Sequence, residues 1–174
     1  MPVYDTSEEL LRKAIASVRS QLYDNWELCI ADDASTAQHV KALLAEARAG
    51  AAHIKVTYRE TKGHISLASN SALALATGEY VVLLDHEDEL TEHALYLVVV
   101  ELNAHPHVVL VYSDEDKITE YGVRHEPYFK PDWNPVGEPL GSLSHHHRPG
   151  SRRVPSKERL DRWDVRDCIR TSRL

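Results

Sequence analysis

Residues 80–88 read YVVLLDHED, five apolar or aromatic residues followed directly by an acidic segment. An uninterrupted apolar run of this length is typical of a strand that is covered on both faces of a sheet. The acidic segment, Asp85-His86-Glu87-Asp88, begins where such a strand should end. We therefore expect a buried strand over 80–84 whose carboxyl end carries several carboxylates.

The alternation of strand and helix patterns continues on both sides of this segment. Strands are predicted at 26–31, 54–58, 80–84 and 108–112, and helices at about 10–22, 35–49, 66–76 and 91–102. Strands that alternate with amphipathic helices favour an α/β fold with a parallel sheet. The sequence thus predicts an α/β domain with a mostly parallel sheet and flanking helices.

Acidic residues follow three of the four predicted strands. They are Asp32-Asp33, the segment 85–88, and Asp114-Glu115-Asp116. Ligands of open α/β sheets bind at the carboxyl ends of the strands, so the three acidic groups could meet at one site. After Asp116 the periodic pattern ends, and Tyr121-Gly122 suggests a turn.

Asp85 and Glu87, one residue apart on a turning backbone, form a candidate site for Mg²⁺ or Mn²⁺. Both carboxylates can face an ion that also takes phosphate oxygens, and the ion then neutralises charge on a leaving diphosphate. The alternative is a solvated acidic loop before the next helix, a position that acidic residues favour. Spacing alone leaves both interpretations open.

Two further segments are candidates for nucleotide contact. Asp32 and Asp33 could accept hydrogen bonds from a base or a ribose, or they could belong to a helix cap with Ser35 and Thr36. Gly63-His64 opens the third helix and could bring backbone N–H groups or an imidazole to a diphosphate. A simple turn at this point explains the same pair of residues.

Seven segments, in order along the chain, resemble the successive blocks of bacterial family 2 glycosyltransferases with the GT-A fold. They are residues 2–6, 26–36, 63–70, 76–80, 84–90, 112–117 and 128–135. The last two resemble one branch of the family, which is linked to O-antigen or rhamnan-type surface glycans. Each block is weak alone, whereas seven in order are specific. The resemblance implies a GT-A fold, a Rossmann-like architecture of transferases that use nucleotide-diphospho-sugars.

The resemblance also implies roles for individual residues. Pro2 and Tyr4 would lie against the nucleotide base, with Asp33, next to Asp32, bonded to the edge of the base. His64 would lie near the diphosphate. Asp85 and Glu87 would match the DxD motif of the family and bind Mg²⁺ or Mn²⁺, although Glu87 stands where the family usually has Asp. The additional methylene moves that carboxylate by about 1 Å, and Asp88 could substitute for it.

The resemblance divides the chain into residues 1–135, a nucleotide-sugar-binding domain with a shortened first strand, and residues 136–174, a basic tail. The family carries its catalytic base, usually an acidic residue, in an acceptor-binding half that no block in 136–174 matches. We therefore expect a truncated, weakly active or inactive transferase. The tail is rich in arginine and has no apolar period, so we expect it to be disordered or derived from a frameshift.

Composition restricts the partners. The net charge of −7 argues against a nucleic-acid surface. No apolar run reaches the roughly 18 residues that span a bilayer, and the start of the chain does not resemble a signal peptide. Two cysteines in dissimilar contexts fit a reducing compartment. We expect a cytoplasmic protein that takes a nucleotide-sugar donor and a glycan or lipid-linked acceptor and that can associate peripherally with the cytoplasmic membrane face.

Two alternative functions fit the same sequence. The first is a non-catalytic remnant that at most binds nucleotide. The second is a receiver-like phosphoacceptor signalling module, because Asp32-Asp33, Asp85 and Lys117 follow successive strands. The glycosyltransferase blocks account for more residues than the receiver pattern does, so the transferase is the preferred interpretation.

Overall fold

A computed structural model describes residues 1–108, 110–119, 121–130, 151–153 and 169–171 of the chain. The elements of the first part are β1 (Pro2–Val3), α1 (Glu8–Arg19), β2 (Leu28–Asp32), α2 (Gln38–Gly50), β3 (Ile54–Tyr58), α3 (His64–Leu73), β4 (Tyr80–Val82) and α4 (Ala94–Ala104). They are followed by β5 (Leu110–Tyr112), β6 (Glu115–Ile118), β7 (Arg124–Tyr128), β8 (Ser151–Arg153) and β9 (Ile169–Thr171). The strand–helix alternation expected from the sequence is confirmed. The strand predicted to be buried over 80–84 is shorter, since β4 ends at Val82, and its residues are half-buried.

The first three strands form a parallel sheet in the order β1-β2-β3. Val3 pairs with Asp32, and Asp32 pairs with Tyr58, so the three strands end at one edge. The N–H of Asp33 donates to Val3 O over 2.8 Å and continues the ladder past the end of β2. This register brings the segments that follow β1, β2 and β3 side by side.

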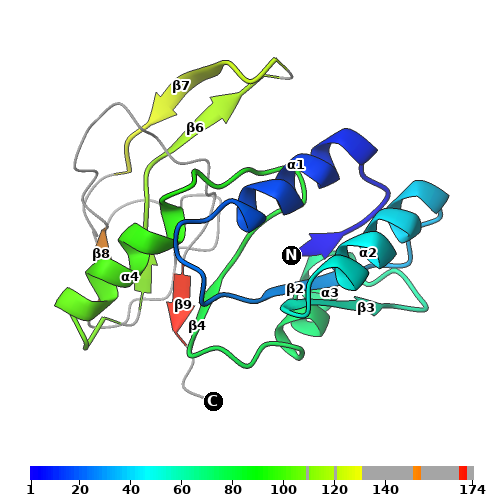
Figure 1. The fold of residues 1–174 in the computed structure, drawn as a ribbon, viewed down its shortest axis with the longest axis horizontal. Coiled ribbons are helices and arrows are strands. Elements are labelled where there is room, and N and C mark those ends of the chain that lie inside the picture. The colour runs from blue at the N-terminus through cyan, green and yellow to red at the C-terminus, as the bar shows by residue number, and fades with distance from the viewer. Residues whose placement is uncertain (109, 120, 131–150, 154–168, 172–174) are drawn as a thin grey trace.

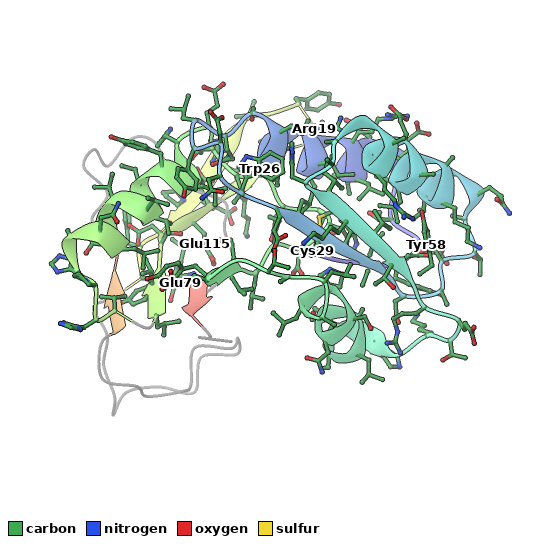
Figure 2. All side chains as sticks on the ribbon, turned by 60° about the horizontal axis from the view of Figure 1, so that its bottom comes forward. Arg19, Trp26, Cys29, Tyr58, Glu79 and Glu115 are labelled. Atoms are coloured by element: carbon green, nitrogen blue, oxygen red, sulfur yellow. The ribbon has the colours of Figure 1, made fainter. Side chains whose placement is uncertain are left out.

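Helices cover both faces of this sheet, as Figure 2 shows with α1 and α2 on one side and α3 on the other. Leu28 and Ile30 of β2 belong to the core that α1 and α2 form, whereas Cys29 and Ala31 lie against α3. Because successive strand residues point to opposite faces, an apolar run such as that of β2 is what a sheet covered on both faces requires.

The packing of the helices follows from their sequences. In α1 the buried residues are Leu11, Ala14, Ile15, Ser17 and Val18, at the spacing of a single helix face, and Ser7 Oγ accepts from Leu10 N to cap the helix. Helix α3 buries only Ala68 and Ala72. Their small side chains let the helix backbone approach Ala31 of the sheet closely.

The remaining strands form two further groups. Strand β9 pairs antiparallel with both β4 and β5, and β8 pairs parallel with β5. Strands β6 and β7 form an antiparallel hairpin, which Figure 1 shows apart from the three-stranded sheet. The turn predicted at Tyr121-Gly122 is confirmed, with Gly122 at φ 77°. It joins two paired strands, although the sequence has no periodic pattern after Asp116.

The predictions for the tail, residues 136–174, fall mostly outside the described residues. Within it the structure describes only the three-residue strands β8 and β9. In the part of the chain that the structure describes, no helix has the length and apolarity needed to cross a membrane.

Candidate functional site

The carboxyl ends of β1 and β2 and the segments that follow them form one edge of the molecule, together with the loop between β3 and α3 and the turn after β4. We call this the carboxyl edge and define it as residues 4–5, 32–36, 59–64 and 85–88. Each of the predicted site residues except Pro2 lies on it, and Pro2 directly precedes it in β1. Its geometry is set by four groups of contacts.

The first group is the Asp33 cluster, which consists of Asp33, Arg59 and Gly63. The Asp33 side chain is 3% exposed, and its Oδ1 accepts a hydrogen bond from Arg59 Nε at 2.8 Å. The N–H of Gly63 donates to Oδ1 at 2.8 Å and to Oδ2 at 3.1 Å. Arg59 also donates through Nη1 to Ser71 Oγ of α3 at 2.8 Å. The carboxylate therefore holds the β3–α3 loop and the start of α3 against the end of β2.

Asp32 and Asp5 make the second group of contacts. Asp32 is 1% exposed, and its Oδ1 accepts from Ser35 N at 3.2 Å, whereas no side chain among the described residues caps α2, which begins at Gln38. The two residues before α2 are instead held by Asp5, whose Oδ1 accepts from Thr36 N at 2.7 Å and from Ala37 N at 2.9 Å. The hydrogen bond from Ala37, with those from Thr36, lowers the pKa of Asp5 below its ordinary value.

The third group joins β1 to the β3–α3 loop. Lys62 Nζ lies 3.4 Å from the centroid of the Tyr4 ring, a cation–π contact. Tyr4 is half-buried and Lys62 is exposed. Tyr4, predicted to lie against a nucleotide base, thus presents an aromatic ring at the carboxyl edge, and a cation covers one of its faces.

The fourth group joins β1 to the acidic turn after β4. The N–H of Asp88 donates to Asp85 O at 3.3 Å, and His86 Nδ1 lies 3.2 Å from Pro2 O. Because a carbonyl oxygen only accepts, the ring nitrogen carries the proton in this contact. The turn is therefore held beside the strand that leads to Tyr4. Asp85 is half-buried, Glu87 is exposed and Asp88 is buried.

A buried polar network fixes the chain that follows this turn. Ser17 Oγ accepts from Leu90 N at 3.1 Å. Gln21 Nε2 donates to Thr91 O at 2.7 Å, and Gln21 Oε1 accepts from Leu95 N at 2.9 Å. Residues 88–95 are thereby tied to the carboxyl end of α1, which limits how far the acidic turn can move.

Three of the four non-glycine residues with positive φ in the described part of the chain lie at this edge, and the fourth, Glu126, lies in β7. Asp5, Ala34 and His64 have φ values of 40°, 63° and 58°, the left-handed region that residues with a Cβ rarely adopt. Such conformations cost about 1–3 kcal/mol each and are typical of functional sites. His64 is exposed and is the first residue of α3, so backbone strain marks the position predicted to lie near a diphosphate.

The carboxyl edge also contains a hollow. A cleft of about 490 Å³ opens beside the ends of β2 and β3, with Asp32, Tyr58 and Arg59 among its lining residues. Figure 2 places Tyr58 at the end of β3, away from Cys29 in the middle of β2. Burial raises the pKa of Tyr58, and the nearby Asp32 carboxylate adds to the effect.

The donor chemistry of the acidic turn fits a divalent cation held jointly with a ligand. Among the described residues no group of three or more His, Cys, Asp or Glu side chains could hold a metal. Asp85 and Glu87 are hard oxygen donors, and Mg²⁺ in particular is commonly held by one or two carboxylates while phosphate oxygens and water supply the rest. The site thus fits a metal that arrives with a diphosphate better than a resident metal.

The third acidic segment does not join the other two in a metal-binding group. Asp114 Oδ1 accepts from Lys130 N at 2.9 Å, and Asp116 Oδ1 accepts from Arg124 Nη1 at 2.7 Å. These contacts hold the β6–β7 hairpin. Lys117, the cation that a receiver module would need, forms an ion pair with Glu126 on the neighbouring strand of the hairpin. The lysine that the receiver interpretation needs is therefore already paired within the hairpin, which argues against that interpretation.

Sequence reasoning missed three residues of this edge, namely Asp5, Arg59 and Lys62. Arg59 and Lys62 were detectable in principle, because the charged run Arg59-Glu60-Thr61-Lys62 directly follows the predicted strand 54–58. Asp5 had no such pattern, since its partners Thr36 and Ala37 are remote in sequence.

The fold is that of the GT-A class of α/β transferases, as the solved structures that match it show. The chain belongs to the glycosyl transferase family 2, whose model matches residues 1–162. That match extends beyond Pro135, where the resemblance recognised in the sequence ended.

Three similar proteins illustrate the relationship. The uncharacterized protein y4gI of Sinorhizobium fredii is 50% identical over 77% of this chain, and the O-antigen biosynthesis protein RfbC of Myxococcus xanthus is 42% identical over 77%. The crystal structure of S. aureus TarS in complex with UDP-GlcNAc superposes with a TM-score of 0.59 and 25% identity over 70% of this chain. The chain spans only 15% of y4gI, 10% of RfbC and 35% of the TarS chain.

Proposed function

We propose that the carboxyl edge binds the nucleotide diphosphate of a sugar donor, for transfer of the sugar to a glycan or lipid-linked acceptor. Pro2 and Tyr4 lie against the base, and Asp33, next to Asp32, faces its edge. His64 lies near the diphosphate, and Asp85 with Glu87 holds Mg²⁺ or Mn²⁺. Family membership and the TarS complex with UDP-GlcNAc support this assignment.

The observation that carries the proposal is the joining of three separate segments at one edge. The contact between His86 and Pro2 O brings the acidic turn to β1. The bond from Gly63 N to Asp33 brings the start of α3 to β2. A nucleotide diphosphate has a base, a ribose and an anionic tail, and these segments offer an aromatic ring, carboxylates and a helix N-terminus in that order.

In this proposal the protein positions the donor. A divalent cation at Asp85 and Glu87 would neutralise charge that develops on the departing diphosphate. Asp33 acts mainly by fixing the Gly63-His64 turn, because its oxygens already accept hydrogen bonds from Arg59 and from the N–H of Gly63. Any bond to the edge of a base uses a remaining lone pair of that carboxylate.

The catalytic base has no assigned residue. The prediction that residues 136–174 lack it concerns residues that are mostly outside the described part of the chain. We propose that these 174 residues alone transfer little or no sugar, because no catalytic base is recognised after Pro135, even though the family model matches as far as residue 162. Loss of a general base typically lowers a rate by about 10²–10⁴-fold. Rapid transfer to any acceptor by the purified chain would contradict this.

Titration calorimetry tests the binding step. The 174-residue chain is titrated with UDP, dTDP and GDP in Mn²⁺, in Mg²⁺ and in EDTA, after circular dichroism has verified that it is folded. We expect one of the three to bind with an affinity that falls at least about tenfold in EDTA. If a folded sample binds none of them, the assignment of the carboxyl edge is wrong.

A further inference from the structure

Lys62 has no assigned role, yet its ammonium group covers the ring on which the base is proposed to lie. The Nζ atom is 3.4 Å from the centroid of the Tyr4 ring. At that distance the ammonium is attracted by the ring, by about 0.5–1 kcal/mol at an exposed site. It also excludes any other group from that face of the ring.

The backbone on both sides of this contact is held in place. The ladder from Asp33 N to Val3 O fixes the strand that leads to Tyr4, and the bond from Gly63 N to Asp33 fixes the residue after Lys62. The lysine side chain itself is exposed and has a flexible four-carbon stem. Lys62 can therefore leave the ring by a side-chain rotation, without movement of the loop.

A base and the Lys62 ammonium are alternative occupants of the Tyr4 ring face. Stacking of a base on an aromatic side chain contributes about 1–3 kcal/mol, enough to displace the cation. An uncharged nucleoside that does so returns the exposed ammonium to water and gives it no new partner. A nucleoside diphosphate offers it an anionic partner instead, next to the Gly63-His64 turn where the diphosphate is proposed to lie.

We propose that Lys62 is a specificity-determining residue, which makes the site select nucleoside diphosphates over uncharged nucleosides. It opposes a base that arrives without phosphate and pairs with the diphosphate when the base takes the ring. This inference rests on the proposed function, because it needs Tyr4 to be the stacking ring.

Calorimetry with paired ligands tests it. The wild-type chain, Lys62→Met, Lys62→Arg and the control Lys13→Met are each titrated with uridine and UDP, thymidine and dTDP, and guanosine and GDP, in Mn²⁺. Lys13 pairs with Glu9 on the surface of α1, away from the carboxyl edge. Arginine keeps a cation that can lie over the ring, whereas methionine keeps the length of the side chain without its charge.

For the pair that binds, Lys62→Met should lower the Kd of the nucleoside about twofold to fivefold. It should raise the Kd of the nucleoside diphosphate about fivefold to tenfold. Lys62→Arg and Lys13→Met should leave both constants close to wild type. If the Kd values of both ligands change in the same direction in Lys62→Met, or if neither Kd changes, this inference is wrong while the proposed function stands. If the wild-type chain binds no nucleoside diphosphate, the proposed function fails and this inference fails with it.

Discussion

At each end of strand β2 a carboxylate binds the backbone beside one end of helix α3, so the two ends can be compared directly. At the carboxyl end is the Asp33 cluster, in which Asp33 receives Arg59 and the N–H of Gly63, just before α3. At the amino end is the Glu27 cluster, which consists of Glu27, Lys55, Thr77 and Gly78. Glu27 receives Lys55 and the N–H groups of Thr77 and Gly78, just after α3. In each cluster a carboxylate binds one cation and the backbone beside the helix.

The surroundings of the two clusters differ. The Asp33 side chain is 3% exposed and that of Glu27 is 20% exposed. The left-handed residues Asp5, Ala34 and His64 and the Lys62–Tyr4 contact lie at the Asp33 end. A carboxylate bound to a cation is therefore not itself a mark of function. Positive-φ residues and a half-buried aromatic ring distinguish the end of β2 that is proposed to bind the donor from the opposite end.

The largest effect is expected from Asp33→Ala. This variant leaves the Arg59 guanidinium, whose side chain is 21% exposed, and the Gly63 N–H without their carboxylate. Removing one partner of a buried pair costs about 3–5 kcal/mol, so we expect the free energy of unfolding to fall by that amount, with loss of nucleotide binding. Glu27→Ala should cost about 1 kcal/mol and leave binding unchanged. Urea denaturation measures the free energy of unfolding of both variants. Equal decreases in the two variants would contradict the distinction between the two ends.

A glycine at each end of α3 provides the second comparison. A Cβ added to Gly63 would lie 2.5 Å from Arg59 Nη2 and 2.7 Å from Leu67 Cβ, whereas one added to Gly78 would meet nothing closer than Tyr80 O at 3.6 Å. Gly63→Ala should therefore destabilise the chain by about 1–3 kcal/mol, and Gly78→Ala by less than about 0.5 kcal/mol. Thermal unfolding of the two variants is the measurement, and a Gly78 variant as unstable as the Gly63 variant would refute it.

The two ends of β4 test the metal site in the same way. Glu87→Ala, after the carboxyl end, should reduce the effect of Mn²⁺ on nucleotide affinity at least about tenfold, while Glu87→Asp should keep or strengthen it. Glu79→Ala, before the amino end, is the matched control, and Figure 2 labels this exposed residue. Calorimetry with and without Mn²⁺ gives the result. Unchanged metal dependence in Glu87→Ala would assign the ligand role to Asp88 or remove the metal site.

The smallest effect concerns pH at the Glu27 cluster. Burial by itself would raise the pKa of Glu27, but hydrogen bonds from Lys55 and from the N–H groups of Thr77 and Gly78 outweigh it and lower the pKa to about 2. A lowered pKa stabilises the fold above the unfolded value, and this contribution is lost as pH falls from about 4.5 to about 2. Since the cluster is partly exposed, we expect this contribution to the free energy of unfolding to be only about 1 kcal/mol.

The measurement is the difference in free energy of unfolding between wild type and Glu27→Gln across that range. The difference should be constant above about pH 5 and should shrink below it. A difference that is independent of pH down to about pH 2.5 would mean that the ion pair does not contribute to stability.

Much of the fold could be predicted because each element carries its own pattern. The apolar run at 80–84 and the segment 26–31 identify strands, and the face of Leu11, Ala14, Ile15 and Val18 identifies α1. These patterns record which residues of a segment are buried, so they can be read from the sequence of that segment alone. The placement of Asp33 and Asp85 beside strand ends follows from the same reasoning, whereas Tyr4 was identified only through the family resemblance. The β6–β7 hairpin was missed because β7 is exposed along its whole length and the charged residues of β6 give no apolar pattern.

The sequence by itself determined the order of elements, the family and the candidate carboxylates of the site. Only the tertiary structure decided the partners of the residues at this edge: Asp33 binds Arg59 and Gly63, Asp5 accepts from Thr36 and Ala37, and Lys62 covers Tyr4. The physical reason is that a periodic pattern records whether a residue is buried, not which remote partner reaches it. That choice depends on strand register and loop closure, which no local pattern encodes.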